Sequence, residues 1–341
     1  MSKFYNKLLA VALTAGALFT SAALAAPKYP FPQQVTYKFG NTATYADPSV
    51  IQSHFDDWKK AWYKDMGDGT ARVISPNDSA ELSVSEGIAY GMLIMVYMSS
   101  NQADHQSEFD KLYAFWNKYA KSGSESGMNW PVDTQRGKVD NGTATDADLD
   151  VAMALIMAAK QWGNDQYLTK AKSLLNWIKS NDMESDGRVK AGSNWNPALN
   201  ASYVFPAAFQ LFADVTGESF WKTAISTNLG HIQKCQNETT GLMPDWCDWS
   251  SHKSTTTGAA VSGGSGGFYD DAARTPWRMA WGYYWYGIED AKKINDKIMP
   301  WLHESTFGNA NLIWPGYSLG GGSPYNMFVT STYAGCVGLV A

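Results

Sequence analysis

Apolar residues recur at helical spacing along almost the whole chain. Five segments carry the one-sided apolar stripe of an amphipathic helix: residues 51–62, 109–119, 167–178, 205–212 and 221–232. Four others are apolar or small on nearly every side: residues 84–98, 149–162, 279–288 and 328–340. A helix that is apolar all round is buried on all sides. The pattern therefore predicts an inner ring of buried helices wrapped by an outer ring of one-sided helices.

The number and spacing of these segments favour an all-α barrel. About a dozen helices of roughly 25 residues each, loops included, would use up the chain, which fits a double-ring α/α barrel better than a four-helix bundle. No polar linker interrupts the pattern, so we expect one catalytic domain over residues 26–341. The glycine-rich tract 251–267 leads directly into Tyr269 and Asp271, and we expect it to form a loop beside a site.

The first 25 residues have the composition of a secretion signal. Lys3 and Lys7 precede an apolar run over residues 8–19, and Ala23-x-Ala25 fits the small-residue site of signal peptidase. The run is shorter than the roughly 20 apolar residues that span a bilayer. We therefore expect residues 1–25 to be removed and the mature protein to be soluble, either secreted or periplasmic.

Charge, histidine spacing and cysteine content limit the binding partners, cofactors and disulfides that we expect. The chain has 27 Lys and Arg against 32 Asp and Glu, a net charge of −5, so nucleic acid and anionic membrane are poor candidate partners. The histidines are scattered without metal-ligand spacing, so no metal or other cofactor is expected. Cys235 and Cys247 lie close enough to pair in an oxidising compartment, which would leave Cys336 over; the sequence leaves this pairing open. We expect a monomer.

Four acids stand at or just before the apparent starts of helices. Glu86 and the pair Asp146 and Asp148 each precede an apolar helical stretch, and Asp271 comes three residues before Arg274. Capping boxes explain the first three equally well, because Ser83-x-x-Glu86, Thr143-x-x-Asp146 and Thr145-x-x-Asp148 all match that motif. A structural ion pair with Arg274 would explain Asp271. However, parallel inner helices all begin at one mouth of a barrel, where such acids would face each other.

Separated acids of this kind suit cleavage of a glycosidic bond. That reaction needs one protonated carboxyl group to protonate the leaving oxygen and one carboxylate to activate water or attack carbon. Burial at an apolar helix start would raise the pKa of Glu86 and suit it to the acid role, whereas Arg274 would keep Asp271 charged and suit it to the base role. The sequence gives no separation between the two carboxyl groups, so it leaves inversion or retention open.

Four segments resemble the signature regions of glycoside hydrolase family 8. They are Ser85–Met92, Ala144–Ala152, Gly241–Trp246 and Asp271-x-x-Arg274. The resemblance implies an (α/α)6 barrel with an open cleft, and inverting hydrolysis of β-1,4-glucan, mixed-linkage glucan, xylan or chitosan.

The same resemblance assigns roles to the acids. It makes Glu86 the proton donor and Asp271 the base that activates water. Asp146 matches the residue often labelled nucleophile, but an inverting mechanism forms no covalent intermediate, so we expect Asp146 to hold the hydroxyls of the sugar ring and favour its distortion. Asp148 would assist or only cap its helix. In the matching subfamily a tyrosine directly precedes the base, whereas here Asp270 stands between Tyr269 and Asp271, which keeps Asp270 as an alternative base.

Aromatic residues supply candidate sugar platforms. The chain has 15 Trp and 18 Tyr, and aromatic faces stack on the apolar faces of sugar rings. Trp130, Trp195 and Trp246 lie in loop-like, polar-flanked stretches, where packing would explain them equally well. With Asp148, Tyr269 and Arg274 they form the expected substrate-binding set.

The first functional hypothesis is a secreted endo-β-1,4-glucanase. Xylan, lichenan and chitosan are alternative substrates that the motifs do not separate. A polysaccharide lyase on a similar helical toroid, or a sugar-binding protein without activity, are alternatives of a different class. The acidic cluster would repel the uronate substrate of a lyase, and a protein that had lost its activity would often have lost one of the three acids.

Overall fold

The structure is a computed structural model that describes residues 26–41, 47–75, 81–255 and 266–322. The leader over residues 1–25, most of the glycine-rich tract, the expected helix over residues 328–340 and Cys336 lie outside these ranges. Expectations about them stay predictions.

Helices dominate the described residues, and each predicted helical segment there coincides with one of them within a few residues. The α-helices are α1 (Pro48–Trp62), α2 (Ser85–Met98), α3 (Gln106–Lys118), α4 (Thr145–Trp162), α5 (Asp165–Asn181), α6 (Pro206–Thr216), α7 (Phe220–Cys235), α8 (Thr275–Tyr286) and α9 (Glu289–Ser305). Short 3-10 helices are η1 (Ala201–Tyr203), η2 (Ala272–Arg274) and η3 (Ala310–Leu312).

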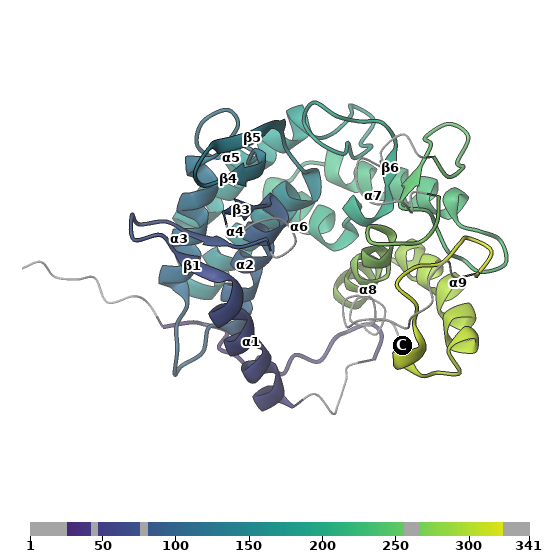
Figure 1. Cartoon of the computed structure of the whole chain (residues 1–341), viewed down its shortest axis with the longest axis horizontal. Helices are drawn as coiled ribbons and strands as arrows, with labels where there is room; N and C mark the ends of the chain where they lie inside the picture. The colour runs from purple at the N-terminus through teal and green to yellow at the C-terminus, as the bar shows by residue number, and fades with distance from the viewer. Residues whose placement is uncertain (1–25, 42–46, 76–80, 256–265, 323–341) are drawn as a thin grey trace, which may run out of the picture.

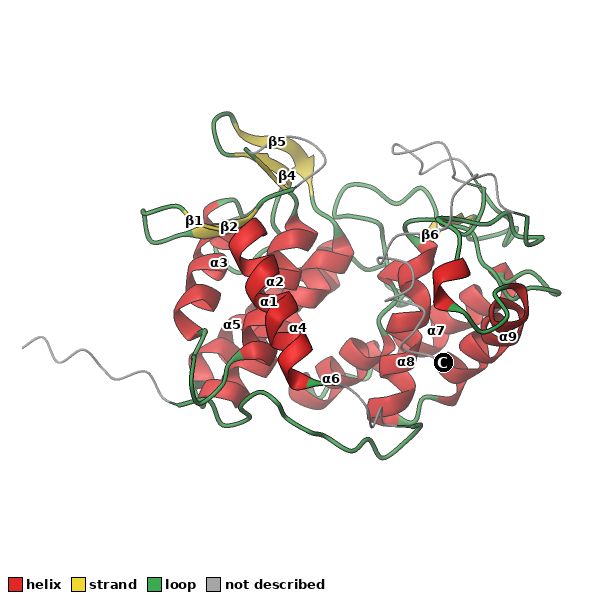
Figure 2. Cartoon of the chain, turned by 60° about the horizontal axis from the view of Figure 1, so that its bottom comes forward, coloured by secondary structure: helices red, strands yellow, loops and turns green. Residues whose placement is uncertain are grey.

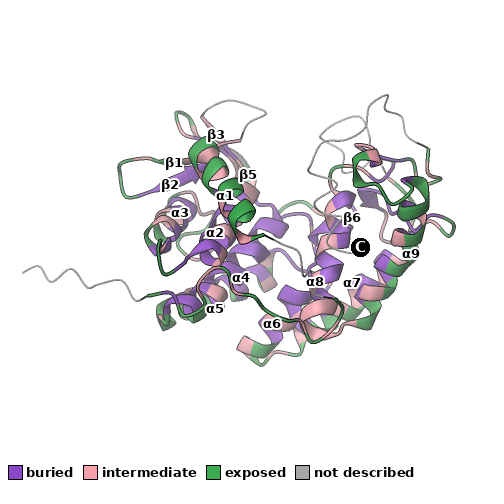
Figure 3. Ribbon diagram, turned by 90° about the horizontal axis from the view of Figure 1, so that it is seen from below, coloured by how far each residue is buried: buried purple, intermediate pink, exposed green. Residues whose placement is uncertain are grey.

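The helices form two layers that follow one another around an arc (Figure 1). In the inner row, α2, α4, α6 and α8 each pack against the next, and α3, α5, α7 and α9 each pack against one of them from outside. Buried residues gather along α2 and α4, whereas α1 is largely exposed (Figure 3). This is the predicted arrangement of buried helices wrapped by one-sided ones.

The segment over residues 205–212 departs from its prediction. Its one-sided stripe indicated an outer helix, but the structure places it in inner helix α6, between α4 and α8. Small residues at its start allow this close packing, since Ala207 and Ala208 are fully buried. A Cβ atom on Gly282 of α8 would lie only 3.0 Å from the Cβ of Pro206. The close approach of the two helices therefore depends on residues without bulk.

The sequence analysis missed helix α9 and all the short strands. The described residues contain three small antiparallel sheets, formed by β1 (Tyr63–Asp65) with β2 (Ala71–Val73), by β3 (Leu82–Ser83) with β4 (Trp130–Asp133) and β5 (Gly137–Gly142), and by β6 (Leu199–Asn200) with β7 (Trp246–Cys247). Strands this short carry too few residues to show alternation. They lie at one end of the helical layers (Figure 2). Because β3 leads into α2 and β5 leads into α4, the middle sheet stands at the N-terminal ends of these two helices.

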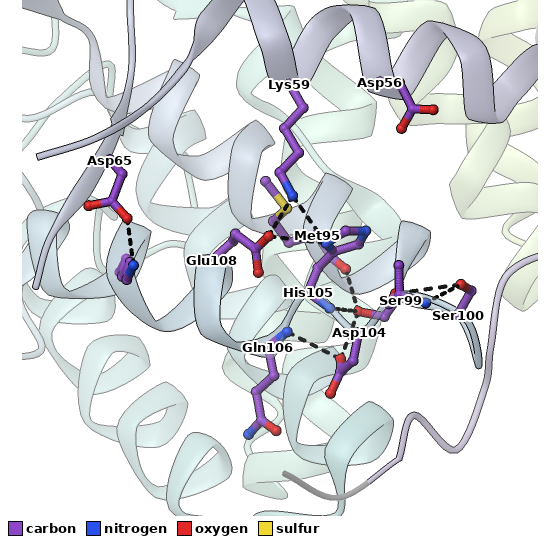
Figure 4. Close-up of polar contacts among 12 residues, drawn as sticks. Asp56, Lys59, Asp65, Met95, Ser99, Ser100, Asp104, His105, Gln106 and Glu108 are labelled. Carbon is purple, nitrogen blue, oxygen red and sulfur yellow. Dashed lines mark hydrogen bonds and ion pairs between the residues drawn. The ribbon is translucent and has the colours of Figure 1, made fainter. Parts of the chain in front are cut away.

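Polar contacts fasten α1 to α3 (Figure 4). The Lys59 ammonium group lies 2.5 Å from Glu108 Oε1 and 3.5 Å from His105 Nδ1. The His105 backbone N–H donates to the hydroxyl of Ser99, just after α2, at 3.0 Å. One cluster therefore joins three successive helices on the outer side of the barrel.

Two further connections hold the ends of the helices. The N-terminal segment over residues 26–41 crosses the C-terminal ends of the inner helices: the Lys28 N–H donates to the Gln161 carbonyl of α4, and Tyr37 stacks on Tyr284 of α8 at 5.5 Å. A disulfide joins Cys235 to Cys247 with a Cα–Cα distance of 6.3 Å, which answers the question that the sequence left open. Among the helices of the described ranges, none is long and apolar enough to cross a membrane.

Candidate active site

The structure brings Asp146 and Asp271 together through one arginine. Arg274 Nη1 lies 2.5 Å from Asp146 Oδ2, and its Nη2 lies 2.7 Å from Asp271 Oδ1. Asp146 comes from the start of α4, while Asp271 directly precedes η2 and Arg274 is its last residue, just before α8. The side chain of Asp146 is 1% exposed and that of Asp271 is 30% exposed. Residues 128 positions apart in the chain therefore share one ion-pair cluster, and its Asp271 end is open to solvent.

Glu86 faces the same cluster from the start of α2. Burial raises the pKa of the Glu86 carboxyl group to about 8, and the negative charge of nearby Asp146 adds to the increase. The Ser85 hydroxyl lies 3.3 Å from Glu86 Oε2. The side chain is partly exposed, so it reaches solvent while it keeps its proton at neutral pH. This is the protonation state that a general acid needs.

The capping-box explanation of these acids is wrong. Helix α2 begins after Val84, which forms no side-chain cap, and the Ser83 hydroxyl instead donates to the Val73 carbonyl at 2.7 Å. Helix α4 begins after Ala144, again without a side-chain cap, and the Thr143 hydroxyl bonds to Asp182. Glu86 and Asp146 therefore stand at helix starts without forming a capping box, although Asp146 Oδ1 accepts a hydrogen bond from the Ala147 N–H in the first turn at 3.0 Å.

A buried aspartate fixes the loop that carries Asp271. Asp245 Oδ1 accepts hydrogen bonds from the backbone N–H groups of Tyr269 at 3.0 Å and Ala272 at 2.8 Å. These two bonds bracket Asp271, whereas Asp270 points to an exposed position. Burial, reinforced by the charge of Asp271, raises the pKa of Asp245 to about 7. The contact with Arg274 favours Asp271 over Asp270 as the functional acid.

Two tyrosines complete the cluster, and the sequence analysis singled out neither. The Tyr203 ring of η1 lies 5.7 Å from the Arg274 guanidinium group, and the Tyr90 hydroxyl of α2 lies 3.4 Å from Arg274 Nη1. Burial raises the pKa of Tyr203, as do the charges of Asp146, Glu86 and Asp271. The phenol therefore stands among all three acids. No spacing pattern in the sequence points to a tyrosine on a three-residue helix.

A second arginine–aspartate pair lies one helical turn deeper. Both terminal nitrogens of Arg278 bond to Asp150 at 2.6 Å, and both side chains are 1% exposed. Asp146 and Asp150 are four residues apart on α4, and Arg278 of α8 follows four residues after Arg274, which directly precedes that helix. Two parallel ion pairs therefore connect the inner helices beneath the open end of the site. The i, i+4 spacing of charges in otherwise apolar segments is the signal that could have revealed the second pair.

The predicted aromatic platforms differ in their access to solvent. Trp195 is 42% exposed and lies 5.1 Å, between ring centroids, from Trp246. Trp246 is only 5% exposed and packs between Trp195 and Tyr203, so it supports the site from below. Trp130 is half-buried on β4, which contacts α2. The Tyr269 ring packs against the loop backbone, since a Cβ on Gly316 would meet it at 2.0 Å.

Asp148 does not join the acid cluster. It is fully buried and points to the other side of α4, where its Oδ1 accepts a hydrogen bond from the Met128 backbone N–H at 3.3 Å. It is neither a cap nor a neighbour of Glu86 and Asp271. Among the residues that the structure describes, no group of three or more His, Cys, Asp or Glu side chains could hold a metal ion.

Comparison with known protein families identifies the family of this chain. The model of glycosyl hydrolases family 8 matches residues 29–315. The chain belongs to this family. It is therefore an (α/α)6 barrel and a glycoside hydrolase that cleaves β-glycosidic bonds.

Family 8 relatives of the chain differ in substrate. The chain is 33% identical to "Endoglucanase C" of Ruminiclostridium cellulolyticum over 357 residues, which cover all of this chain and 74% of the relative. It is 25% identical to the reducing-end xylose-releasing exo-oligoxylanase Rex8A of Paenibacillus barcinonensis, over 72% of this chain and 71% of that one. A solved apo structure of a β-1,3-1,4-glucanase from Paenibacillus sp. X4 matches with a TM-score of 0.82 at 26% identity, covering 93% of this chain and 89% of that one.

Proposed function

We propose that this family 8 enzyme is an exported endo-β-1,4-glucanase that cleaves internal bonds of cellulose-type β-glucan with inversion. The observation that carries the proposal is the cluster in which Arg274 joins Asp146 to Asp271 beside a Glu86 that keeps its proton. The composition of residues 1–25 supports export to the periplasm or the medium.

Each acid has one task in the proposed reaction. Glu86 donates its proton to the glycosidic oxygen as the bond to the anomeric carbon breaks. Asp271 accepts a proton from the water that attacks that carbon from the opposite face of the ring. Both electron pairs are accounted for: the leaving oxygen takes the pair of the broken bond, and water supplies the pair of the new one. Neither step forms a bond between enzyme and sugar.

Asp146 and the aromatic residues hold the substrate in this proposal. Asp146 is paired with Arg274 and its charge acts on Glu86, and in this proposal its carboxylate would accept hydrogen bonds from the hydroxyls of the ring being cleaved. The exposed face of Trp195 would stack on a glucose unit further along the chain. The buried Trp246 beneath it would fix the orientation of Trp195.

The named substrates of the relatives support glucan as the first choice. The relative with 33% identity is an endoglucanase, and the solved structure at 26% identity is a β-1,3-1,4-glucanase. Xylan, lichenan and chitosan remain alternative substrates for the same site. No feature of the site favours a lyase, because the three acids would repel a uronate.

Release of reducing sugar tests the proposal. The enzyme is incubated with carboxymethylcellulose, lichenan, xylan and chitosan, and viscosity is followed beside reducing ends to separate internal from terminal cleavage. We expect the cellulose derivative or lichenan to lose viscosity early. Glu86→Gln should still bind while losing about 10²- to 10⁴-fold in kcat, as general-acid catalysis predicts. The exposed Glu238→Gln serves as the matched control and should retain full activity.

Two outcomes would contradict the proposal. Undiminished cleavage by Glu86→Gln would remove Glu86 from the acid role. Release of terminal xylose alone, without a fall in viscosity of any glucan, would replace the endoglucanase with an exo-acting xylanase.

A further inference from the structure

Two aspartates outside the acid cluster meet in a fully buried position behind α4. Asp148 lies in the first turn of α4, Asp182 follows the C-terminal end of α5, and both are 0% exposed. Their carboxyl groups are hydrogen-bonded to each other. Asp148 Oδ1 also accepts from the Met128 N–H, and Asp182 Oδ1 accepts from the Thr143 hydroxyl, each at 3.3 Å. The remaining oxygen of each, Oδ2, is buried and accepts no hydrogen bond from an amide, hydroxyl, ammonium or guanidinium group of the described residues.

A proton shared by the two carboxyl groups explains how they can lie in contact. Two touching carboxyl groups that are both 0% exposed cannot readily both be ionised, and a proton on one of them turns it into a donor to the other. The charged groups that act on Asp182, besides Asp148, are the ammonium groups of Lys190 and Lys121, which favour its ionised form. Burial, the negative charge of Asp182 and the hydrogen bond with it raise the pKa of Asp148 well above its usual range. The proton therefore resides on Asp148, and Asp182 accepts it.

The pair contacts the segment that leads to Trp130. Asp148 holds the backbone of Met128, and a Cβ atom on the preceding Gly127 would lie 2.7 Å from Asp148 Oδ1. Only glycine lets the chain pass this close to the carboxyl group. Two residues after Met128 the chain reaches Trp130 at the start of β4.

The pair also contacts the segments that carry Trp195 and Asp146. The Thr143 hydroxyl that donates to Asp182 accepts a hydrogen bond from the Ser193 N–H at 3.1 Å, two residues before Trp195. The same Thr143 lies three residues before Asp146. The Asp182 carbonyl accepts from the Lys190 N–H at 2.9 Å. Three segments of the candidate site therefore meet at one buried acid pair.

We propose that Asp148 and Asp182 are positioning residues that share one buried proton and hold, from behind, the segments that present Asp146, Trp130 and Trp195 to the glycan. The positioning role rests on the proposed function, because it assumes that these three residues bind substrate. The shared proton does not depend on that assumption.

Stability measured against pH tests the shared proton. The folded protein binds a proton at Asp148 that the unfolded chain releases above its ordinary pKa of about 4. This contribution to stability is fully present below about pH 4 and is lost as pH rises toward the raised pKa of Asp148. Asp148→Asn keeps a donor to Asp182 and an acceptor for Met128 but does not titrate. Relative to this variant, the wild-type folded-to-unfolded ratio should fall by up to about tenfold per pH unit.

The measurement is urea unfolding of the wild type, Asp148→Asn and the exposed control Asp57→Asn between pH 5 and 8. We expect the free energy of unfolding of Asp57→Asn to change with pH as that of the wild type does. The free energy of unfolding of Asp148→Asn should rise relative to both as pH increases. Parallel curves for the wild type and Asp148→Asn would overturn the shared proton. The result holds whether or not the protein cleaves a glucan.

Kinetics test the positioning role separately. At pH 6, Asp148→Asn should keep kcat/KM within about threefold of the wild type, while Asp148→Ala should lose at least about tenfold at a temperature where circular dichroism shows it folded. Equal kcat/KM for the Asn and Ala variants would overturn positioning. If Asp148→Ala does not fold, Asp148→Asn must still flatten the alkaline fall of kcat/KM, and an unchanged profile would be the refutation. Absence of wild-type activity on every β-glycan would instead refute the proposed function and leave the stability result to decide the shared proton.

Discussion

Removal of the deeper arginine should destabilise the barrel strongly. Arg278→Met deletes both hydrogen bonds to Asp150, each 2.6 Å long, and leaves a carboxyl group that is 1% exposed without its partner. It also removes the guanidinium group from the Phe205 and Trp277 rings, whose centroids lie 4.2 and 4.4 Å away. Breaking one partner of a buried ion pair costs about 3–5 kcal/mol. The affected helices are α4, which carries Asp146 one turn above Asp150, and α8, which Arg274 directly precedes.

Protonation of Asp150 limits how much stability Arg278→Met loses. Burial already raises the pKa of Asp150, and Arg278 opposes this rise. Without Arg278 the Asp150 carboxyl group would take up a proton, so we expect the lower part of the range, about 3 kcal/mol. For a chain of this size that corresponds to a fall in Tm of roughly 4–5 °C.

Urea unfolding at pH 6 and thermal unfolding measure this loss. The double variant Asp150→Leu with Arg278→Met should recover most of it, because apolar side chains of similar volume leave no unpaired charge. Lys293→Met, which breaks an exposed pair with Asp290, is the control and should change stability by less than about 0.5 kcal/mol. The reasoning would be refuted if Arg278→Met lost less than about 1 kcal/mol of unfolding free energy. It would also be refuted if the loss in the double variant equalled the sum of the losses in the two single variants.

Three other predictions concern the site directly. Because Glu86 acts in its protonated form and its pKa is raised to about 8, kcat/KM of Asp148→Asn, in which Asp148 does not titrate, should fall tenfold per pH unit only above about pH 8, and a fall beginning near pH 5 would show an ordinary carboxyl group. Asp245→Ala should lower kcat by about tenfold or more through displacement of Asp271, with Asp245→Asn restoring most of it since its amide oxygen still accepts both backbone bonds; equal kcat for the two variants would contradict this. Trp195→Ala should raise KM by about two- to tenfold with little change in kcat, as loss of one stacking contact predicts, and an unchanged KM would remove it from the substrate path.

The helical layers could be predicted from sequence because the apolar pattern records burial directly. Helices α2 and α4 are apolar nearly all round, and the structure buries them on all sides. Helix α6 shows where this method fails: Gln210 and Asp214 on its outer side gave it the stripe of an outer helix, although its small residues pack it into the inner row. The short strands escaped detection because two to six residues hold no measurable period.

The acids of the site could be predicted and their supports could not. Glu86, Asp146 and Asp271 stand out because charge at the start of an apolar helix is unusual. Asp245 and Asp182 act through backbone and side-chain partners that are remote in sequence, so no local pattern distinguishes them from ordinary loop aspartates. Ser83 and Glu86 match a capping box in sequence, but they do not form one. The hydroxyl of Ser83 bonds instead to Val73 on a neighbouring strand, which a local motif does not reveal.

The configuration of the first product tests the assignment of Glu86 and Asp271 most directly. A cello-oligosaccharide or lichenan is cleaved in an NMR tube, and the anomeric protons of the new reducing ends are followed before mutarotation. An acid and a water-activating base acting on opposite faces of the ring produce the α-anomer first, with the β-anomer appearing only as mutarotation proceeds. A product that is β from the first spectrum would show a covalent intermediate and would contradict the account.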